Sequence, residues 1–395
     1  MRFSIGLLLA IVTSVTAESY LDSIYGEVTG PSIHLENVGE IDEFSLNHEF
    51  GYNRIKSKLN LPSDDDTSDL DGLLYFGGIV TYGHRPHLEC FNPDNDTLST
   101  SVDIAVVGAP FDTGVSYRTG ARFGPNSIRS ALRRMEAGDG TYGQEHRTKK
   151  SIIDCGDVPM TPFDNRIALN QLYRGQRAIH RFRSDTTKKS TKIITLGGDH
   201  TVSLMCLKSA FETYKQPLHV IHFDSHLDTW NPKVLGGGIS HYMLLNHGTF
   251  LHYALEKGYI ATENNIHVGL RAPFIDFEYD PVHDAECGFK AIGAREIDRI
   301  GIRGILHKIH TTIPKDAPVY ITVDIDVLDP SSAPGTGTME VGGWTTRELL
   351  SVLDGLKGLN VVGADVVEVS PPFDTNSEIT SLAATAVIES FILIM

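Results

Sequence analysis

Residues 218–228, LHVIHFDSHLD, contain a short apolar run that ends in three candidate metal ligands, Asp224, His226 and Asp228. Two other apolar runs end in the same manner, in Asp199-His200 and in Asp324-Ile325-Asp326. Nearly continuous apolar runs of this length are typical of parallel strands that are buried on both faces. Ligands of an open α/β sheet bind beyond the carboxyl ends of its strands. The pattern therefore predicts a parallel sheet with a site at its carboxyl edge.

The same kind of strand signal recurs along the chain and alternates with amphipathic stretches. Eight strands are expected, at 102–108, 151–155, 192–197, 218–223, 265–270, 288–292, 318–323 and 361–367. Helices are expected between them, at 125–137, 165–184, 202–215, 243–257, 345–356 and 381–394. Such alternation predicts an α/β fold, an eight-stranded parallel sheet between layers of helices. Residues 75–395 show neither an internal repeat nor a break in composition, so we expect one domain there.

The amino-terminal part has a different character. Residues 1–17 combine one cation, a short apolar run and small residues before Glu18, which is the layout of a signal peptide. We therefore expect a protein that is secreted or held in a vacuolar lumen, with Asn95 as a candidate glycosylation site. The polar residues 18–74 contain an acidic run at 63–69 and predict an extension that is partly disordered.

Charge and cysteine content narrow the function classes. The 395-residue chain has a formal charge of -16, which argues against binding to a nucleic-acid backbone and suits a small cationic substrate better. After residue 17 no stretch is long and apolar enough for a membrane helix, so no membrane association is expected once the signal is removed. Four cysteines in a chain of this length do not make a disulfide scaffold, although the sequence allows one disulfide bond. Cys155 and Cys206 are interpreted first as small buried apolar residues.

The candidate ligands form one chemical set of four carboxylates and two imidazoles: His200, Asp224, His226, Asp228, Asp324 and Asp326. On extended strands a spacing of two places Asp224, His226 and Asp228 on one side, and likewise Asp324 and Asp326. Uncompensated groups of this kind repel one another unless cations neutralise them. Oxygen-rich ligation with some imidazole favours Mn²⁺, and four carboxylates suit two ions.

Other acids and histidines have simpler interpretations. Asp199 is a candidate outer partner of the site, and Asp329, which precedes a proline, is expected to form a turn. The separate histidines His219, His267, His283 and His307 are expected to be surface or core residues.

Seven segments together resemble the ureohydrolases, the family of arginase, agmatinase, guanidinobutyrase and formiminoglutamase. They are FGGI (76–79), GAPFDTGVSYRTGARFGPNSIR (108–129), LGGDHTVS (196–203), HFDSHLDTW (222–230), NHGTF (246–250), ITVDIDVLDPSSAPGTGT (321–338) and DVVEVSPPFD (365–374). The similarity runs from about residue 75 to the end, and the motifs are most like those of fungal-type secreted agmatinases. It implies the three-layer arginase-like fold and assembly as a trimer or hexamer.

The resemblance also implies roles for single residues. The six candidate ligands match the family's manganese ligands, so two Mn²⁺ ions per chain are expected, with a water activated between them for attack on a guanidinium carbon. His247 matches the histidine that delivers a proton to the departing amine, and His241 stays a competing candidate. Glu368 matches the glutamate that pairs with the substrate guanidinium. The alternative is that Glu368 has a structural role and pairs with Arg271 or Arg118.

The resemblance favours agmatine, which would be hydrolysed to putrescine and urea. The loop after Asp228 lacks the arginase signature for an α-amino acid. The main rival substrate is 4-guanidinobutanoate, whose carboxylate Lys233, Arg118 or Arg271 could hold. Two other classes stay open: a secreted binding protein of the same fold that has lost turnover, and a deacetylase of related fold with a single zinc ion.

Overall fold

The computed structural model describes residues 78–92, 100–133, 150–236 and 244–395. The predicted signal peptide at 1–17, the extension at 18–74, Asn95 and His241 lie outside these described residues.

Eight parallel strands form one sheet in the order β2-β1-β3-β8-β7-β4-β5-β6. Their bounds are β1 Ile104–Gly108, β2 Ile152–Asp157, β3 Lys192–Leu196, β4 His219–Phe223, β5 Asn265–Leu270, β6 Phe289–Gly293, β7 Val319–Asp324 and β8 Val361–Val367. Every predicted strand is confirmed, with its ends displaced by two residues at most. The sheet and its strand directions confirm the predicted fold class.

Side chains of successive strand residues enter two separate hydrophobic cores. On β1, Ile104 and Val106 pack in one core, while Ala105 and Val107 pack in the other. This alternation is the period of two that a pleated strand imposes. Because both sides of the sheet are buried along the central strands, these strands have nearly continuous apolar sequences, whereas the edge strand β6 exposes Lys290.

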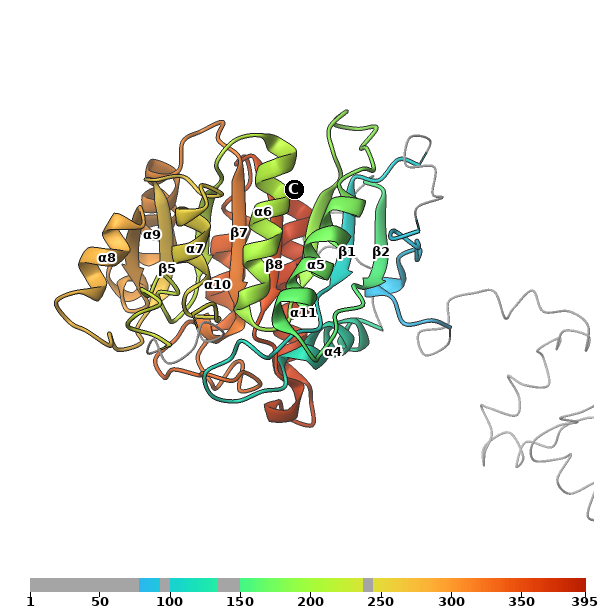
Figure 1. The fold of residues 1–395 in the computed structure, drawn as a ribbon. Coiled ribbons are helices and arrows are strands. Elements are labelled where there is room, and N and C mark those ends of the chain that lie inside the picture. The colour runs from blue at the N-terminus through green and yellow to red at the C-terminus, as the bar shows by residue number, and fades with distance from the viewer. Residues whose placement is uncertain (1–77, 93–99, 134–149, 237–243) are drawn as a thin grey trace, which may run out of the picture. The chain divides into compact units, whose positions relative to one another are not determined.

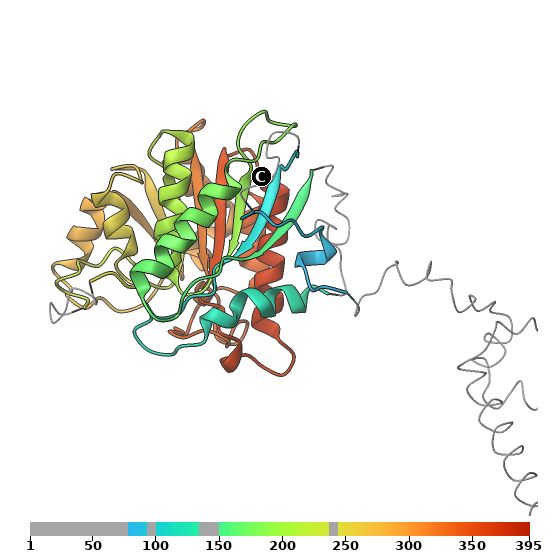
Figure 2. The same cartoon turned by 45° about the vertical axis from the view of Figure 1, so that its right-hand side comes forward.

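Helices cover both faces of the sheet (Figures 1 and 2). One core contains side chains of α5 Asn165–Ile179, α6 Ser203–Tyr214 and α7 Phe250–Glu256. The other core contains side chains of α4 Gly124–Ala131, α9 Glu296–Thr312, α10 Thr346–Asp354 and α11 Ile379–Ile394. Another short helix, α8 Asp280–Glu286, precedes β6. Among the helices of the described ranges, none combines the length and the hydropathy needed to cross a bilayer.

The predicted helix at 243–257 is corrected in the structure, where α7 begins only at Phe250. The residues before it form a turn instead. Asn246 Oδ1 accepts a hydrogen bond from Gly248 N, and Thr249 Oγ1 donates to the carbonyl of Leu244. These local side-chain bonds compete with the helical pattern.

The interpretation of Cys155 as a simple buried apolar residue is wrong, because Cys155 forms a disulfide with Cys90. The segment before Cys90 lies along β2, where Leu88 N donates to the carbonyl of Asp154 and His87 forms a bridge with the same residue. This pairing places the two cysteines side by side. Cys206 is buried and unbridged, as expected, and so is Cys287.

Candidate metal centre

Four strands that are neighbours in the sheet supply the chemical groups of one site. In the order β3-β8-β7-β4, the four residues at or shortly after the strand ends are His200, Glu368, Asp324 and Asp224. Their carboxyl ends lie at the lower edge of the sheet in Figure 1, where the turn after β8 is drawn in red. The central strands therefore bring together residues that are far apart in the sequence.

The same local hydrogen bond occurs at or shortly after three strand ends. An aspartate accepts it from the backbone N–H of the residue two positions later. Asp224 Oδ1 accepts from His226 N at 2.6 Å, and Asp324 Oδ1 accepts from Asp326 N at 2.8 Å. Asp199 Oδ1 likewise accepts from Thr201 N at 2.9 Å. Each bond turns the chain sharply.

These turns correct the expectation that the ligands alternate along extended strands. Strand β4 ends at Phe223, so Asp224, His226 and Asp228 lie in an irregular segment, and Asp326 lies in a 3-10 turn. The groups converge because the chain folds around the site after each strand end.

His200 lies at the centre of the first group of candidate ligands. Its Nδ1 is 3.1 Å from Asp224 Oδ2, 3.0 Å from Asp228 Oδ2 and 3.4 Å from Asp324 Oδ2. His200 and Asp224 are fully buried, and none of these approaches has the geometry of a hydrogen bond. One nitrogen facing three acidic oxygens is an arrangement that suits a cation among them.

A second group shares Asp224 with the first. His226 Nδ1 lies 3.3 Å from Asp224 Oδ1 and 3.1 Å from Asp326 Oδ2. Ligand atoms of Asp224, His226 and Asp326 all lie within 4.8 Å of one another. Because Asp224 belongs to both groups, the geometry suits two adjacent ions.

Burial and neighbouring carboxylates destabilise the charge of two aspartates of the site, whereas the surrounding histidines lower the pKa of Asp224 well below its ordinary value. Burial and the neighbouring Asp224 raise the pKa of Asp228 to about 6. Burial, Asp326 and Asp224 raise the pKa of Asp324 well above its ordinary value. A cation relieves this repulsion and favours the ionised carboxylates.

Buried polar atoms without a partner provide the test of fit for metal ions. His200 Nδ1, Asp224 Oδ2 and Asp326 Oδ2 are inaccessible and make no hydrogen bond in the described part of the chain. Buried polar atoms normally find a partner. These atoms, together with the carboxylate-rich donor set, fit divalent ions that prefer oxygen and imidazole. The six predicted ligands are the residues that would hold them.

The sequence analysis missed His222. This buried residue of β4 has Nε2 3.0 Å from Asp224 Oδ2 and Nδ1 2.8 Å from His267 Nδ1. His267 Nε2 in turn lies 2.9 Å from Asp284 Oδ1. Burial lowers the pKa of His222 to about 3, so its imidazole is neutral. The signal was its position two residues before Asp224, in the apolar run that leads to the site.

His247 and Glu368 form a pair beside the ligands. His247 Nδ1 lies 3.0 Å from Glu368 Oε1, which also accepts a hydrogen bond from His200 N. His247 Nε2 lies 2.8 Å from Ser116 Oγ, which can accept a hydrogen bond from the protonated ring. Burial disfavours the imidazolium, but Glu368 and Asp228 more than compensate and raise the pKa of His247 to about 9. His247 is thus prepared to carry a proton.

The structure does not support the alternative pairing of Glu368 with an arginine. Arg271 donates to backbone carbonyls, including those of Asp326 and Leu328, and Arg118 lies over the rings of Tyr117 and Phe373. Glu368 has a left-handed backbone, with φ of 60°. Strained backbone of this kind is concentrated at functional sites.

A cavity of about 120 Å³ opens onto these groups. Its described lining residues are Ser116, His226, Asp228, Trp230, Leu235, His247, Gly248, Ile275, Asp324 and Thr338. They provide acidic, imidazole, hydroxyl and apolar surfaces. This described lining contains no lysine or arginine.

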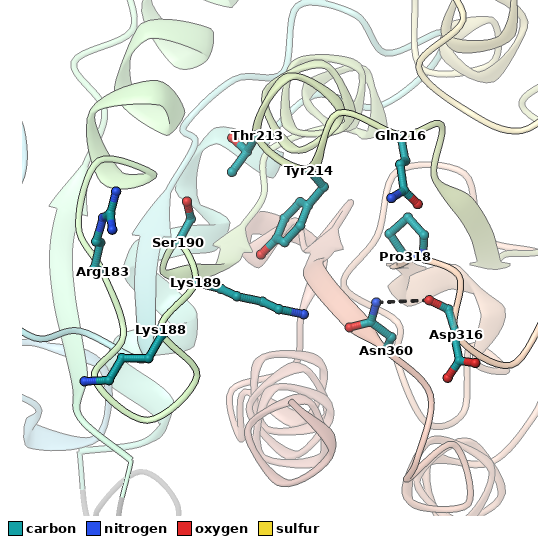
Figure 3. Close-up of a pocket in the computed structure, with 10 residues that line it drawn as sticks. All are labelled: Arg183, Lys188, Lys189, Ser190, Thr213, Tyr214, Gln216, Asp316, Pro318 and Asn360. Carbon is teal, nitrogen blue, oxygen red and sulfur yellow. Dashed lines mark hydrogen bonds between the residues drawn. The ribbon is translucent and has the colours of Figure 1, made fainter.

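A larger cavity, of about 490 Å³, lies at the opposite edge of the sheet (Figure 3). Its lining includes Ser190, Pro318 and Asn360, which precede β3, β7 and β8. None of the predicted ligands takes part in it. Although this cavity is larger, the chemistry of the smaller one identifies the candidate active site.

Comparisons with known proteins agree with this geometry. Residues 102–394 match the model of the arginase family. "Putative agmatinase 1" of Schizosaccharomyces pombe is 45% identical over 336 residues, covering 81% of this chain and 83% of that protein. The guanidinobutyrase of Pseudomonas aeruginosa is 31% identical and covers 80% and 92%. The solved proclavaminate amidino hydrolase of Streptomyces clavuligerus is 30% identical, with a TM-score of 0.69 and coverage of 81% and 98%. The chain therefore belongs to the arginase family.

Proposed function

We propose that this chain is a hydrolase of guanidino compounds that converts agmatine and water to putrescine and urea with the aid of two Mn²⁺ ions. The observation that carries the choice of agmatine is the cavity, whose described lining contains no lysine or arginine. Its two acidic residues, Asp228 and Asp324, are candidate metal ligands, so the choice depends on the lack of a cationic partner for a substrate carboxylate in this described lining. The similarity to agmatinases supports the same choice.

The six ligands would hold the ions, which supply a water of lowered pKa and neutralise developing negative charge. The protein's own groups position the substrate and move the proton. Both contacts of Glu368 described above involve Oε1, which leaves Oε2 to accept N–H groups of the guanidinium. His247, held between Glu368 and the hydroxyl of Ser116, gives its proton to the departing amine.

The position of the candidate cations disfavours 4-guanidinobutanoate. Arg271 is engaged with backbone carbonyls, and neither Arg271, Arg118 nor Lys233 lines the described cavity. A non-catalytic binding protein would not need all six ligands together with the His247–Glu368 pair. A deacetylase with one zinc ion would not need a second group that shares Asp224.

The test is a substrate panel with purified protein in Mn²⁺, in which urea release is measured from agmatine, 4-guanidinobutanoate and arginine. We expect the highest kcat/KM for agmatine. Faster urea release from 4-guanidinobutanoate would contradict the substrate assignment but keep the reaction class. Absence of urea from all guanidino compounds tested would contradict both.

We also propose that the mature protein begins near Glu18 and follows the secretory route. The signal-like segment 1–17 motivates this, and the Cys90–Cys155 disulfide supports it, because such bonds persist in oxidising compartments. Amino-terminal sequencing of the natural protein should find a start near Glu18. An intact Met1 on the abundant form would contradict the proposal.

A further inference from the structure

Two histidines and a cysteine form a cluster outside the residues of the candidate metal centre. His252 belongs to α7, His283 belongs to α8, and Cys287 directly follows α8. His252 Nδ1 lies 3.1 Å from His283 Nε2, which lies 3.7 Å from Cys287 Sγ. Each residue offers one ligand atom, and all three atoms lie within 4.8 Å of one another. The spacing of four between His283 and Cys287 places both on one face of the helix.

The distances suit a single tetrahedral zinc ion. With Zn–N near 2.05 Å and Zn–S near 2.3 Å, tetrahedral geometry separates two nitrogens by about 3.3 Å and a nitrogen from a sulfur by about 3.6 Å. The observed separations of 3.1 Å and 3.7 Å are close to these values. Small side-chain adjustments would therefore complete the geometry.

The remaining imidazole nitrogens face groups that commonly orient a metal-bound histidine. His252 Nε2 lies 3.8 Å from a carboxylate oxygen of Glu256. His283 Nδ1 lies 3.4 Å from the hydroxyl of Tyr279 and 3.9 Å from Glu286 Oε2. A ligating histidine usually donates its second N–H to a carboxylate or another acceptor, which fixes its tautomer.

A neighbouring ring packs against one side of the cluster, and the other side is partly exposed. The rings of Tyr279 and His283 stack with centroids 5.3 Å apart and planes inclined by 12°. Cys287 is buried, whereas the side chain of His252 is 20% exposed. An ion and a water molecule can therefore approach from the side of His252.

We propose that His252, His283 and Cys287 bind one Zn²⁺ ion, with a water molecule as the fourth ligand. On binding, the Cys287 thiol loses its proton to solvent and the sulfur bonds to the ion as a thiolate. Sulfur ligation favours zinc over manganese, which separates this site chemically from the carboxylate-rich centre. The ion would join α7 to α8.

This connection would matter for the active site, and to that extent it rests on the proposed function. In α8, Asp280 accepts a hydrogen bond from Trp230 Nε1 and Asp284 accepts one from Thr229 Oγ1. Thr229 and Trp230 directly follow the candidate ligand Asp228. Zinc would stabilise the helix that holds this segment.

Cobalt(II) is the probe for a test that does not depend on urea release. Added to the mature, Mn²⁺-loaded protein, it should give a thiolate-to-cobalt charge-transfer band in the near ultraviolet, and Zn²⁺ should remove the band by competition. The carboxylate-rich centre contains no sulfur ligand and cannot produce this band. Absence of the band, or its persistence when Zn²⁺ is added, would overturn the proposal.

Three variants locate the site. Cys287→Ser should lose the band, whereas Cys206→Ser, which changes the other unbridged cysteine, should retain it. His252→Gln changes a partly exposed side chain and should weaken cobalt binding in a protein that still folds. Zn²⁺ should also raise the Tm of the unmodified protein but not that of Cys287→Ser. A band that persists in Cys287→Ser, or equal cobalt affinity in His252→Gln, would overturn the proposal.

Discussion

Replacing His247 with asparagine removes the proposed proton donor while keeping much of its surroundings. An asparagine amide can still donate toward Glu368, which lies 3.0 Å from His247 Nδ1, but it carries no proton to give to an amine. Loss of a general acid typically costs about 10²- to 10⁴-fold in rate. This corresponds to about 3 to 5 kcal/mol of additional barrier. We therefore expect kcat for urea release to fall within this range.

The pH dependence of the same step gives a second readout. Glu368 helps to raise the pKa of His247 above its ordinary value, so the proton donor is present at lower pH and is lost as pH rises through that pKa. Glu368→Gln removes the charge and lowers the pKa of His247. The alkaline limb of the kcat profile should therefore move to lower pH in this variant.

The assay measures urea release at saturating agmatine, with the metal content of each variant determined in parallel. His247 belongs to neither ligand group of the described centre, so His247→Asn should keep its metal. His241→Asn is the control, and its kcat for urea release should be nearly that of the wild type. Wild-type turnover in His247→Asn would refute the role of His247 as the proton donor. If His241→Asn carried the loss instead, the two roles would have to be exchanged.

Three further changes probe the surroundings. Asp326→Ala should abolish urea release and reduce bound Mn²⁺, since its Oδ2 belongs to the second ligand group; normal metal content would contradict the assignment. Asp284→Asn should weaken Mn²⁺ binding by about ten- to a hundredfold, because Asp284 ends the hydrogen-bonded chain through His267 to the ligand region. Mn²⁺ titration checks this, and unchanged affinity would oppose it. Replacing Cys90 and Cys155 with alanine opens a bridge across 65 residues and should lower the free energy of unfolding by about 4 kcal/mol. Denaturant titration measures the loss, and equal stability would exclude this contribution.

The sheet and the edge at which the candidate ligands lie could be predicted because one physical rule governs both. Strands buried on both faces have apolar sequences, and their polar neighbours mark the carboxyl edge. The path of the chain beyond each strand could not be obtained in this manner. Asp224 and Asp324 fold their own following residues into turns, which only the side-chain hydrogen bonds reveal.

Other features depend on contacts between distant segments. His222 resembles a core residue of a strand until His267 and Asp284 are placed beside it. The partner of Cys155 depends on the pairing of an earlier segment with β2. Helix α9 was absent from the predicted helices, and Gly301 within it adopts a φ of 64°, which interrupts the helical period.

The number of Mn²⁺ ions bound by the active protein tests the central claim most directly. The measurement is best made on Cys287→Ser, so that the proposed zinc ligand cannot contribute. Two groups of ligands that share Asp224 predict two ions per chain, with urea release rising until the second ion is bound. Full activity with a single bound ion, or with none, would contradict the account.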